Sequence, residues 1–372
     1  MKVIIAAAGT AGHINPGIAI ANKIKEENPD AKIMFIGTVR GIENDLVPRA
    51  GYELKTIEAY GIQKKINIQN IKNMFKTLKG FSEAKKIVEK EKPDLVIGTG
   101  GYICGAVLTA AQKLRIPTML HESNSYPGLA VRFLSKKTDV IMVAFKEAKE
   151  RLKNAKEVVI TGTPTKIRNI KIDKNKVKEE LGINNTLPIV LVFGGSQGAR
   201  VINNNLLEIV KKGLNDNYQL IWAPGQKQYD VVKEELLKSN ININNIKNVK
   251  VFPYIYNMQE IMAVSDLIIA RSGAMTLTEM AIMGKPGIFI PLPSRNANRQ
   301  EDNARVFENI NAGKVILEEE LNYEKLASSI NELIKDKEKL VLMGENARKI
   351  ARENAEGVIY AEIKKLLNKT NV

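Results

Sequence analysis

The chain has 372 residues, about twice the roughly 100 to 200 residues of a typical domain, so we expect two domains with separate cores. Hydrophobic residues make up 44% and charged residues 26%, which excludes a disordered or fibrous chain. The net charge of +15 indicates an anionic partner, which composition alone leaves open between nucleic acid, membrane lipid and a phosphorylated substrate.

The first half of the chain alternates apolar, β-rich runs with helix-length amphipathic segments. Strands are predicted at residues 3–7, 32–36, 95–97 and 118–120, and most of them end in glycine-rich turns. This order is typical of a parallel sheet with helices on both faces. Helix breakers then follow one another up to Pro164, where we predict a hinge.

The second half repeats the alternation and predicts a second doubly wound domain. Its strands are predicted at residues 189–193, 220–222, 267–269 and 287–290, and residues 321–367 are predicted to be helical throughout. The predicted domains are 1–163, with a C-terminal helix at 356–372 packing back onto it, and 164–355. Two Rossmann-like domains of this kind bind ligands at the carboxyl ends of their strands, in a cleft that the two domains face.

Targeting signals are missing from the sequence. Cys104 is the only cysteine, which excludes an intrachain disulfide and is typical of a reducing compartment. The apolar run before Gly9 is too short for a signal peptide, so we expect a cytoplasmic protein. Residues 95–112 carry no charge, but glycines interrupt them, and we interpret them as strand, loop and helix.

Glycine-rich turns follow three of the predicted strands, at residues 8–13, 98–102 and 194–199. Glycine lets the backbone approach a ligand, and the N–H groups of the following helix bind an anion, helped in the third turn by Ser196. The alternative is a tight turn without a ligand. No turn completes the dinucleotide fingerprint, which disfavours hydride transfer. We therefore predict an enzyme with two phosphorylated substrates, one held by each domain.

The two histidines, His13 and His121, each lie at a predicted strand end beside a predicted loop of the cleft. His13 is a candidate general base or a hydrogen-bond donor to phosphate. His121 is interpreted as a brace for the loop that carries Asn124.

In the second domain, residues 271–279 follow a strand and open a helix, which again suits phosphate, while Glu279 is placed to accept hydrogen bonds from ribose hydroxyls. The alternative for Glu279 is a solvated helix charge. Gln300 and Asn303 share a predicted helix face, and their amides suit sugar hydroxyls. No Asp-x-Asp pair, His/Cys cluster or ATP-binding P-loop is present, so we expect neither a metal nor a cofactor.

Taken in order, these motifs resemble the MurG family of bacterial glycosyltransferases over essentially the whole chain. The resemblance implies a GT-B fold, with UDP-N-acetylglucosamine (UDP-GlcNAc) as donor in the second domain and lipid I, undecaprenyl-pyrophosphoryl-MurNAc-pentapeptide, as acceptor on the first. It implies inverting, metal-independent transfer of GlcNAc to the C4 hydroxyl of MurNAc, forming lipid II for peptidoglycan synthesis.

Site residues follow from the resemblance position by position, with His13 as the catalytic residue. The donor residues that it implies are Thr10, Ala11, Gly12, Asn124, Lys166, Ser196, Ile255, Ala274, Met275, Thr276, Glu279, Gln300 and Asn303. The acceptor residues that it implies are Thr10, Ala11, Gly12, Gly100, Gly101 and Tyr102. The chain departs from the family at Ala8 and Ala11, where glycine is usual, and at Lys166, where arginine is usual and would bind phosphate through two hydrogen bonds.

Residues 62–81 interleave large apolar side chains with five lysines, the pattern of a basic amphipathic helix. Together with a lipid-linked acceptor, this pattern predicts peripheral binding to the cytoplasmic face of the cell membrane. The alternative is a helix that packs on its own sheet.

Two further functions stay open at this point. A UDP-GlcNAc 2-epimerase shares the fold and the donor but needs no lipid. A non-catalytic basic protein that binds nucleic acid would use the same lysines, but the chain lacks a recognisable motif with interleaved aromatic residues, so we expect no nucleic-acid partner.

Overall fold

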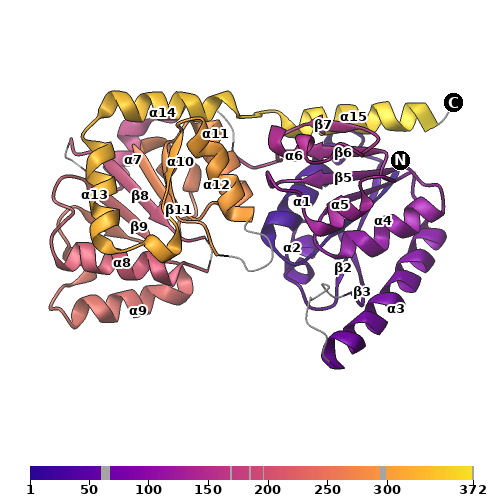
Figure 1. The fold of residues 1–372 in the computed structure, drawn as a ribbon, viewed down its shortest axis with the longest axis horizontal. Coiled ribbons are helices and arrows are strands. Elements are labelled where there is room, and N and C mark those ends of the chain that lie inside the picture. Colours follow the sequence, from indigo (N-terminus) through magenta and orange to yellow (C-terminus); the bar gives the residue numbers. More distant parts are fainter. Residues whose placement is uncertain (60–67, 168–169, 184–185, 196, 294–298, 371–372) are drawn as a thin grey trace. The chain divides into compact units, whose positions relative to one another are not determined.

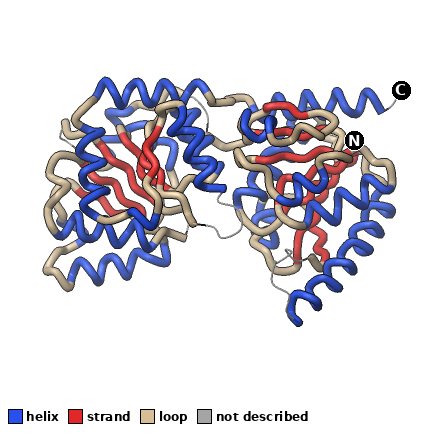
Figure 2. Tube along the Cα trace, viewed as in Figure 1, coloured by secondary structure: helices blue, strands red, loops and turns tan. Residues whose placement is uncertain are grey.

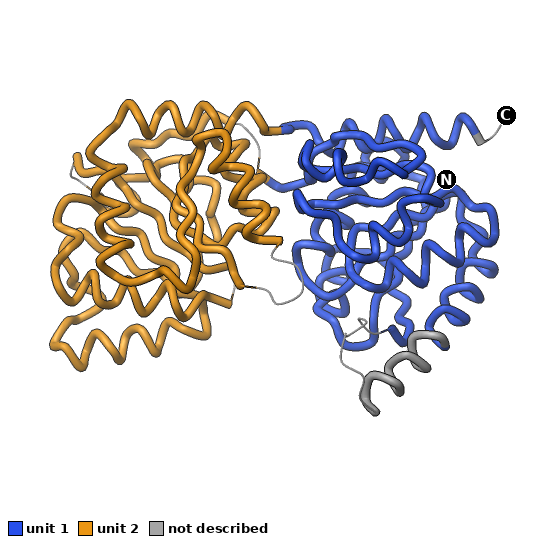
Figure 3. The backbone as a smooth tube through the Cα atoms, viewed as in Figure 1, with its two compact units in different colours: residues 1–166, 352–372 blue, residues 167–351 orange. Residues whose placement is uncertain are grey.

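A computed structural model describes residues 1–59, 68–167, 170–183, 186–195, 197–293 and 299–370, without the side chains of residues 68–78 and 370. The chain forms two compact units (Figure 3). The first comprises Met1–Lys166 together with Arg352–Val372, and the second comprises Ile167–Ala351. Each unit is a parallel sheet surrounded by helices (Figure 2).

The first unit contains a seven-stranded sheet (Figure 1). Its strands are β1 (Lys2–Ala7), β2 (Lys32–Thr38), β3 (Glu53–Ile57), β4 (Leu95–Gly100), β5 (Thr118–Glu122), β6 (Val140–Val143) and β7 (Val158–Ile160). Its helices are α1 (Ala11–Glu27), α2 (Glu43–Arg49), α3 (Ile68–Glu91), α4 (Ile103–Lys113), α5 (Leu129–Leu134), α6 (Lys146–Glu150) and α15 (Ala355–Thr370). The strands are all parallel, in the order β3-β2-β1-β4-β5-β6-β7.

The C-terminal helix α15 completes the core of the first unit. Ile359 and Ile363 are fully buried in the same apolar cluster as Ile14 of α1 and Ile5 of β1. Because this buried face comes from the far end of the chain, the first unit needs both termini to close its core.

The second unit contains a six-stranded parallel sheet in the order β10-β9-β8-β11-β12-β13. The strands are β8 (Ile189–Phe193), β9 (Gln219–Ala223), β10 (Val249–Val251), β11 (Leu267–Ala270), β12 (Gly287–Phe289) and β13 (Gly313–Val315). The helices are α7 (Lys174–Glu180), α8 (Arg200–Lys211), α9 (Gln226–Leu237), α10 (Met258–Val264), α11 (Ala274–Met283), α12 (Arg299–Asn309), α13 (Tyr323–Ile334) and α14 (Lys337–Lys349), with 3-10 turns η1 (Ile243–Asn245) and η2 (Glu318–Glu320).

Both sheets reverse their strand order at one point, between β1 and β4 in the first unit and between β8 and β11 in the second. At such a point the connections leave toward opposite faces of the sheet and open a crevice beyond the carboxyl ends of the strands. The predicted glycine-rich turns follow β1 and β8 and overlap the end of β4, so the fold places all three at these two crevices.

The predicted strands and the doubly wound class are confirmed, while three boundaries were wrong. Helix α1 begins at Ala11, inside the predicted turn 8–13, so His13 lies in its first turn. Strand β4 continues to Gly100 because Gly98 still pairs with Leu120 and Gly100 pairs with Ala7. The helical tail is interrupted: the side chain of Asp336 accepts a hydrogen bond from the backbone N–H of Lys339 and starts a separate helix, α14.

No helix among the described residues is long and apolar enough to cross a membrane. The predicted amphipathic segment 62–81 lies largely outside the described residues, because residues 60–67 and the side chains of 68–78 are not part of the description.

Candidate functional site

In the first unit, the turn after β1 is held by a carboxylate from the turn after β2. Gly9, at φ +98°, donates its backbone N–H to Oε2 of Glu43 at 3.2 Å. Glu43 is fully buried, and its Oε1 accepts bonds from the backbone N–H and the hydroxyl of Thr38, at 2.9 and 2.6 Å. Burial raises the pKa of the Glu43 carboxyl, but these hydrogen bonds outweigh it and hold the pKa below its usual range. An ionised carboxylate therefore fixes the turn.

The His13 imidazole is oriented by the backbone. Its Nδ1 lies 3.1 Å from the carbonyl oxygen of Ala8, and its own carbonyl accepts a hydrogen bond from the Thr99 hydroxyl at 2.8 Å. A carbonyl oxygen only accepts, so Nδ1 carries the proton of the neutral ring. The proton-accepting nitrogen of His13 is then Nε2, as a general base requires.

The end of β4 packs directly on this histidine. A Cβ added to Gly100, at φ +129°, would lie 2.7 Å from Cγ of His13, and one added to Gly101 would lie 2.6 Å from the carbonyl oxygen of Ala8. Only glycine fits at such distances. The fold thus brings two separately predicted turns, 8–13 and 98–102, into one site, with the partly exposed Tyr102 beside them at the start of α4.

A second buried carboxylate orients the turn after β5. Oε1 of Glu122 accepts hydrogen bonds from the backbone N–H and the side-chain Nδ2 of Asn124, at 2.9 and 2.8 Å, and Oε2 accepts the N–H of Gly128 at 2.6 Å. His121 is buried beside it and donates Nε2–H to the carbonyl of Gly162 at 2.9 Å. Burial lowers the pKa of His121, so this histidine is neutral and joins two strand ends.

In the second unit, the turn after β8 is shaped by close backbone packing. Gly195 and Gly198 have φ values of +88° and +77°, and a Cβ on Gly198 would overlap the carbonyl oxygen of Pro224. Asn203 of α8 donates to that same carbonyl at 3.1 Å and accepts the indole N–H of Trp222 at 3.0 Å. Buried polar contacts therefore hold the turn. Ser196, predicted to contact the diphosphate, lies outside the described residues.

The turn before α11 is tied to the first turn of α12. The Ser272 hydroxyl donates to the carbonyl of Gln300 at 2.7 Å, and Nδ2 of Asn303 donates to the carbonyl of Ser272 at 3.3 Å. Oε1 of Gln300 accepts the backbone N–H of Leu292 at 2.9 Å. Asn303 is fully buried, so its side chain supports the start of α11, whereas Gln300 is only half-buried.

The remaining predicted residues divide between the two units. Thr10, Ala11 and Gly12 form the exposed to half-buried start of α1, and Lys166 is an exposed residue at the end of the first unit. In the second unit Met275, Thr276 and Glu279 are half-buried in α11, while Ala274 and Ile255 are buried, the latter at 6% exposure.

Two buried carboxylates that hold these turns, Glu43 and Glu122, were not predicted as site residues. Neither lies in one of the predicted glycine-rich turns, so no sequence signal singled them out. Among the described residues, no group of three or more His, Cys, Asp or Glu side chains is arranged to hold a metal ion.

The first unit thus presents the oriented imidazole of His13 beside a glycine turn. The second presents the starts of two helices, α8 and α11, at the point where its strand order reverses. Helix starts of this kind bind phosphate through backbone N–H groups. Two family models match the chain: the glycosyltransferase family 28 N-terminal domain over residues 3–143 and its C-terminal domain over residues 189–359.

The chain belongs to glycosyltransferase family 28.

Within this family, the chain is 42% identical over 370 residues to the UDP-N-acetylglucosamine–N-acetylmuramyl-(pentapeptide) pyrophosphoryl-undecaprenol N-acetylglucosamine transferase of Acetivibrio thermocellus, covering 99% of this chain and 98% of the relative. The crystal structure of Acinetobacter baumannii MurG matches with a TM-score of 0.78 and 27% identity, over 98% of this chain and 99% of that one. A UDP-GlcNAc 2-epimerase from Neisseria meningitidis matches at 16% identity and a TM-score of 0.64, over 98% of this chain and all of that one, which shows a shared fold alone.

Proposed function

We propose that this family 28 enzyme transfers N-acetylglucosamine from UDP-GlcNAc to the C4 hydroxyl of MurNAc in lipid I and so forms lipid II for peptidoglycan synthesis. The observation that carries the proposal is the near-complete, two-domain match to a relative whose name states this donor and acceptor. The orientation of His13 supports it independently, because transfer to a sugar hydroxyl needs a base at the acceptor.

In the proposed reaction, Nε2 of His13 takes the proton from the C4 hydroxyl as its oxygen attacks the anomeric carbon of GlcNAc. The bond from that carbon to the β-phosphate oxygen breaks, and UDP leaves with the electron pair. A single displacement inverts the anomeric carbon and gives a β-1,4 bond. The hydrogen bond from Nδ1 to Ala8 stabilises the imidazolium that forms, because the carbonyl dipole faces the new charge.

Donor binding is assigned to the second unit. Backbone N–H groups at the start of α11, contributed by Ala274, Met275 and Thr276, and the turn that contains Ser196 would hold the diphosphate without a metal. Glu279 would accept hydrogen bonds from the ribose, and Ile255 would pack on the uracil. Gln300 would contact GlcNAc, and the buried Asn303 would act through Ser272.

The acceptor is assigned to the first unit, where Thr10, Ala11 and Gly12 begin α1 and Gly100, Gly101 and Tyr102 lie beside them. The start of α1 would bind the diphosphate of lipid I. Asn124, whose side chain is oriented by Glu122, and Lys166 are also assigned to donor binding.

We further propose that the enzyme binds the cytoplasmic face of the cell membrane peripherally through the basic amphipathic segment 62–81. A lipid-linked acceptor and the excess of positive charge support this location. Co-sedimentation with phosphatidylglycerol vesicles tests this proposal. A variant with Lys64, Lys65 and Lys72 changed to glutamine is expected to stay in solution. If that variant sedimented with the vesicles as the wild-type protein does, the assignment would be contradicted.

The transfer itself is tested with radiolabelled UDP-GlcNAc, a short-chain lipid I analogue and a chelator. We expect label in the lipid product at an undiminished rate with the chelator, and complete loss of transfer under chelation would contradict the metal-free mechanism. The same enzyme without acceptor distinguishes the epimerase: formation of UDP-ManNAc with no transfer to lipid I would replace the proposal.

A further inference from the structure

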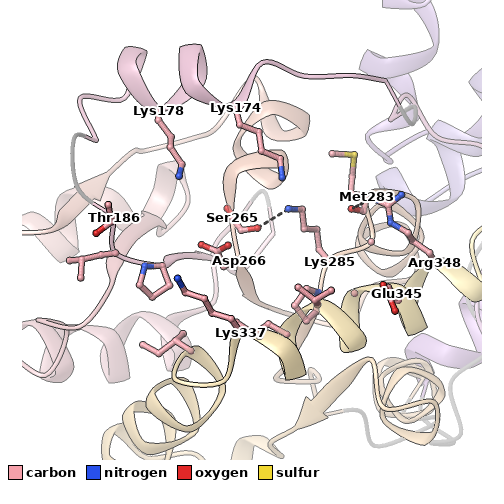
Figure 4. A pocket seen from close by; sticks show the side chains of 18 residues that line it. Lys174, Lys178, Thr186, Ser265, Asp266, Met283, Lys285, Lys337, Glu345 and Arg348 are labelled. Carbon is pink, nitrogen blue, oxygen red and sulfur yellow. Dashed lines mark hydrogen bonds between the residues drawn. The ribbon is translucent and has the colours of Figure 1, made fainter.

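The second unit contains a basic pocket at the opposite end of its strands from the predicted donor site. Its volume is about 620 Å³, and its lining includes Pro188, Asp266 and Pro286, which directly precede β8, β11 and β12. Figure 4 shows the side chains that line it. Helices α7 and α14 contribute the side walls through Lys178 and Lys337. The pocket therefore lies at the amino ends of the strands.

Five cationic side chains line this pocket against two carboxylates. The cations are Lys174, Lys178, Lys285, Lys337 and Arg348, and the carboxylates are Asp266 and Glu345. None of the five cations makes a salt bridge with a carboxylate in the described part of the chain. Asp266 is engaged elsewhere, because its Oδ2 accepts the backbone N–H of Ile189 at 2.7 Å. The five cations outnumber the two carboxylates, so the pocket carries a net positive charge.

Lys285 is the deepest of these cations and is held in place by the backbone. Its Nζ donates to the carbonyl oxygens of Ala263 and Ser265, at 2.9 and 2.8 Å, which leaves one of its three N–H donors for a further acceptor. Lys174 points toward it from α7 (Figure 4). Burial, followed by the charge of Lys174, lowers the pKa of Lys285 to about 8, and the nearby carboxylate of Asp266 offsets this lowering only in part.

This pocket is separate from the predicted donor site. Strands β8 and β11 are 5 and 4 residues long, so at about 3.3 Å per residue their amino and carboxyl ends lie roughly 13 to 17 Å apart. The donor residues of the second unit follow the carboxyl ends of β8 and β11, while Lys285 and Asp266 precede strands.

We propose that this pocket is a second anion site of the enzyme, which binds a small phosphate-bearing molecule through Lys174, Lys178 and Lys285. A compact group of convergent cations around a fixed ammonium suits clustered phosphate oxygens, since each oxygen accepts several charge-assisted hydrogen bonds. The volume is sufficient for an anion larger than one phosphate.

Calorimetric titration of the full chain with inorganic tripolyphosphate tests the proposal. Saturating UDP is present throughout, so that the donor site is occupied. We expect one equivalent to bind, and Lys174→Gln/Lys178→Gln to weaken binding roughly tenfold, because two charge-assisted contacts are lost. Both lysines lie toward solvent, so this variant is expected to fold; Lys285→Met tests the deeper contact.

The matched control, Lys233→Gln/Lys238→Gln, removes the same charge from exposed positions at the end of α9 and should bind tripolyphosphate as wild type does. Equal weakening by both double variants, or no binding by wild type, would overturn the proposal. Phosphatidylglycerol vesicles distinguish a lipid source: vesicle binding that depends on Lys174 and Lys178 without tripolyphosphate binding would contradict a small soluble ligand.

Protection of Lys285 gives a second readout. Reaction of the chain with acetic anhydride at pH 8, followed by peptide mass spectrometry, is expected to modify Lys285 several-fold more slowly when tripolyphosphate is bound, because the anion favours the unreactive ammonium. Unchanged modification of Lys285 at a saturating tripolyphosphate concentration would place the ligand elsewhere.

Discussion

The two sheets each reverse their strand order beside glycine-rich turns that lead from a strand into a helix, yet the glycines there differ in what they accommodate. In the first unit, Gly100 leaves room for the His13 imidazole. In the second, Gly198 leaves room for the backbone of Pro224. The first arrangement orients a group that exchanges protons, whereas the second fixes a rigid backbone surface. In the proposed mechanism, the same local fold thus supports chemistry in one unit and ligand binding in the other.

The largest effect is expected from His13→Ala. Loss of the general base should lower kcat by roughly 10² to 10⁴, while the Kd for UDP stays within about twofold of wild type, because the donor is assigned to the second unit. Transfer kinetics and UDP titration measure the two quantities. Lys23→Ala, on the same helix, is the control and should keep wild-type turnover. Unchanged kcat in His13→Ala would remove the base from the mechanism.

Gly100→Ala should also act on turnover, by moving His13. The added Cβ would overlap the imidazole, and a displacement near 1 Å can cost about a hundredfold in kcat. Gly51→Ala is the matched control, because Gly51 also has a positive φ, +83°, but nothing lies within 4 Å of its added Cβ. Equal kcat values for the two variants would show that backbone strain, and not the histidine, is responsible.

Gly198→Ala, in the second unit, should weaken donor binding and leave turnover largely intact, unlike the two substitutions in the first unit. Its Cβ would push the turn away from Pro224, and we expect the Kd for UDP to rise about tenfold with kcat at saturating donor little changed. Gly213→Ala, at φ +66° with open space around the added Cβ, controls for strain. A fall in kcat without a change in Kd would contradict the division of labour.

The smallest effect concerns an ion-pair network confined to the first unit. Glu91 of α3 lies 2.7 Å from Nζ of Lys2 and 2.5 Å from Nζ of Lys55, and the hydrogen bonds from these two ammonium groups lower its pKa to about 2. Because the pKa of Glu91 is lower in the folded protein, its ionised carboxylate stabilises the fold at a pH above about 4.5. This contribution to the free energy of unfolding is lost as the pH falls from about 4.5 to about 2.

In Glu91→Gln, the free energy of unfolding should therefore fall less steeply as the pH is lowered through this range. The difference from wild type should be no more than about 1 kcal/mol, because the network lies near solvent. Urea midpoints for unfolding of the first unit, measured between pH 5 and pH 2, give the comparison. Glu89→Gln, on the same helix and paired with Lys85 at the surface, is expected to follow the wild-type profile. Identical profiles for all three proteins would exclude the network as a source of pH dependence.

Much of the fold could be predicted from sequence because buried parallel strands are nearly continuous apolar runs, such as residues 189–193. The glycine turns could be located for the same reason, since they interrupt these runs. The glycine turn 8–13 was predicted to be longer than it is, because α1 already begins at Ala11 and accommodates Pro16 in its second turn.

The supporting carboxylates could not be predicted, because their role depends on contacts between segments distant in sequence. Glu43 reaches Gly9 across 34 positions, and it fits only because Gly37 and Gly41 leave space for its side chain. Asn303 was predicted to bind sugar from helix spacing, which does not show that its side chain is fully buried and donates to the carbonyl of Ser272. Periodicity gives the face of a helix, whereas burial decides which polar groups on that face support the site.

The central claim, that an oriented base in the first unit directs a single displacement on a donor held by the second, is tested most directly by the structure of the product. The disaccharide made from UDP-GlcNAc and a lipid I analogue is released and its new bond is assigned by NMR. We predict a β bond from GlcNAc to O4 of MurNAc. An α bond, or attachment at another hydroxyl, would contradict the account.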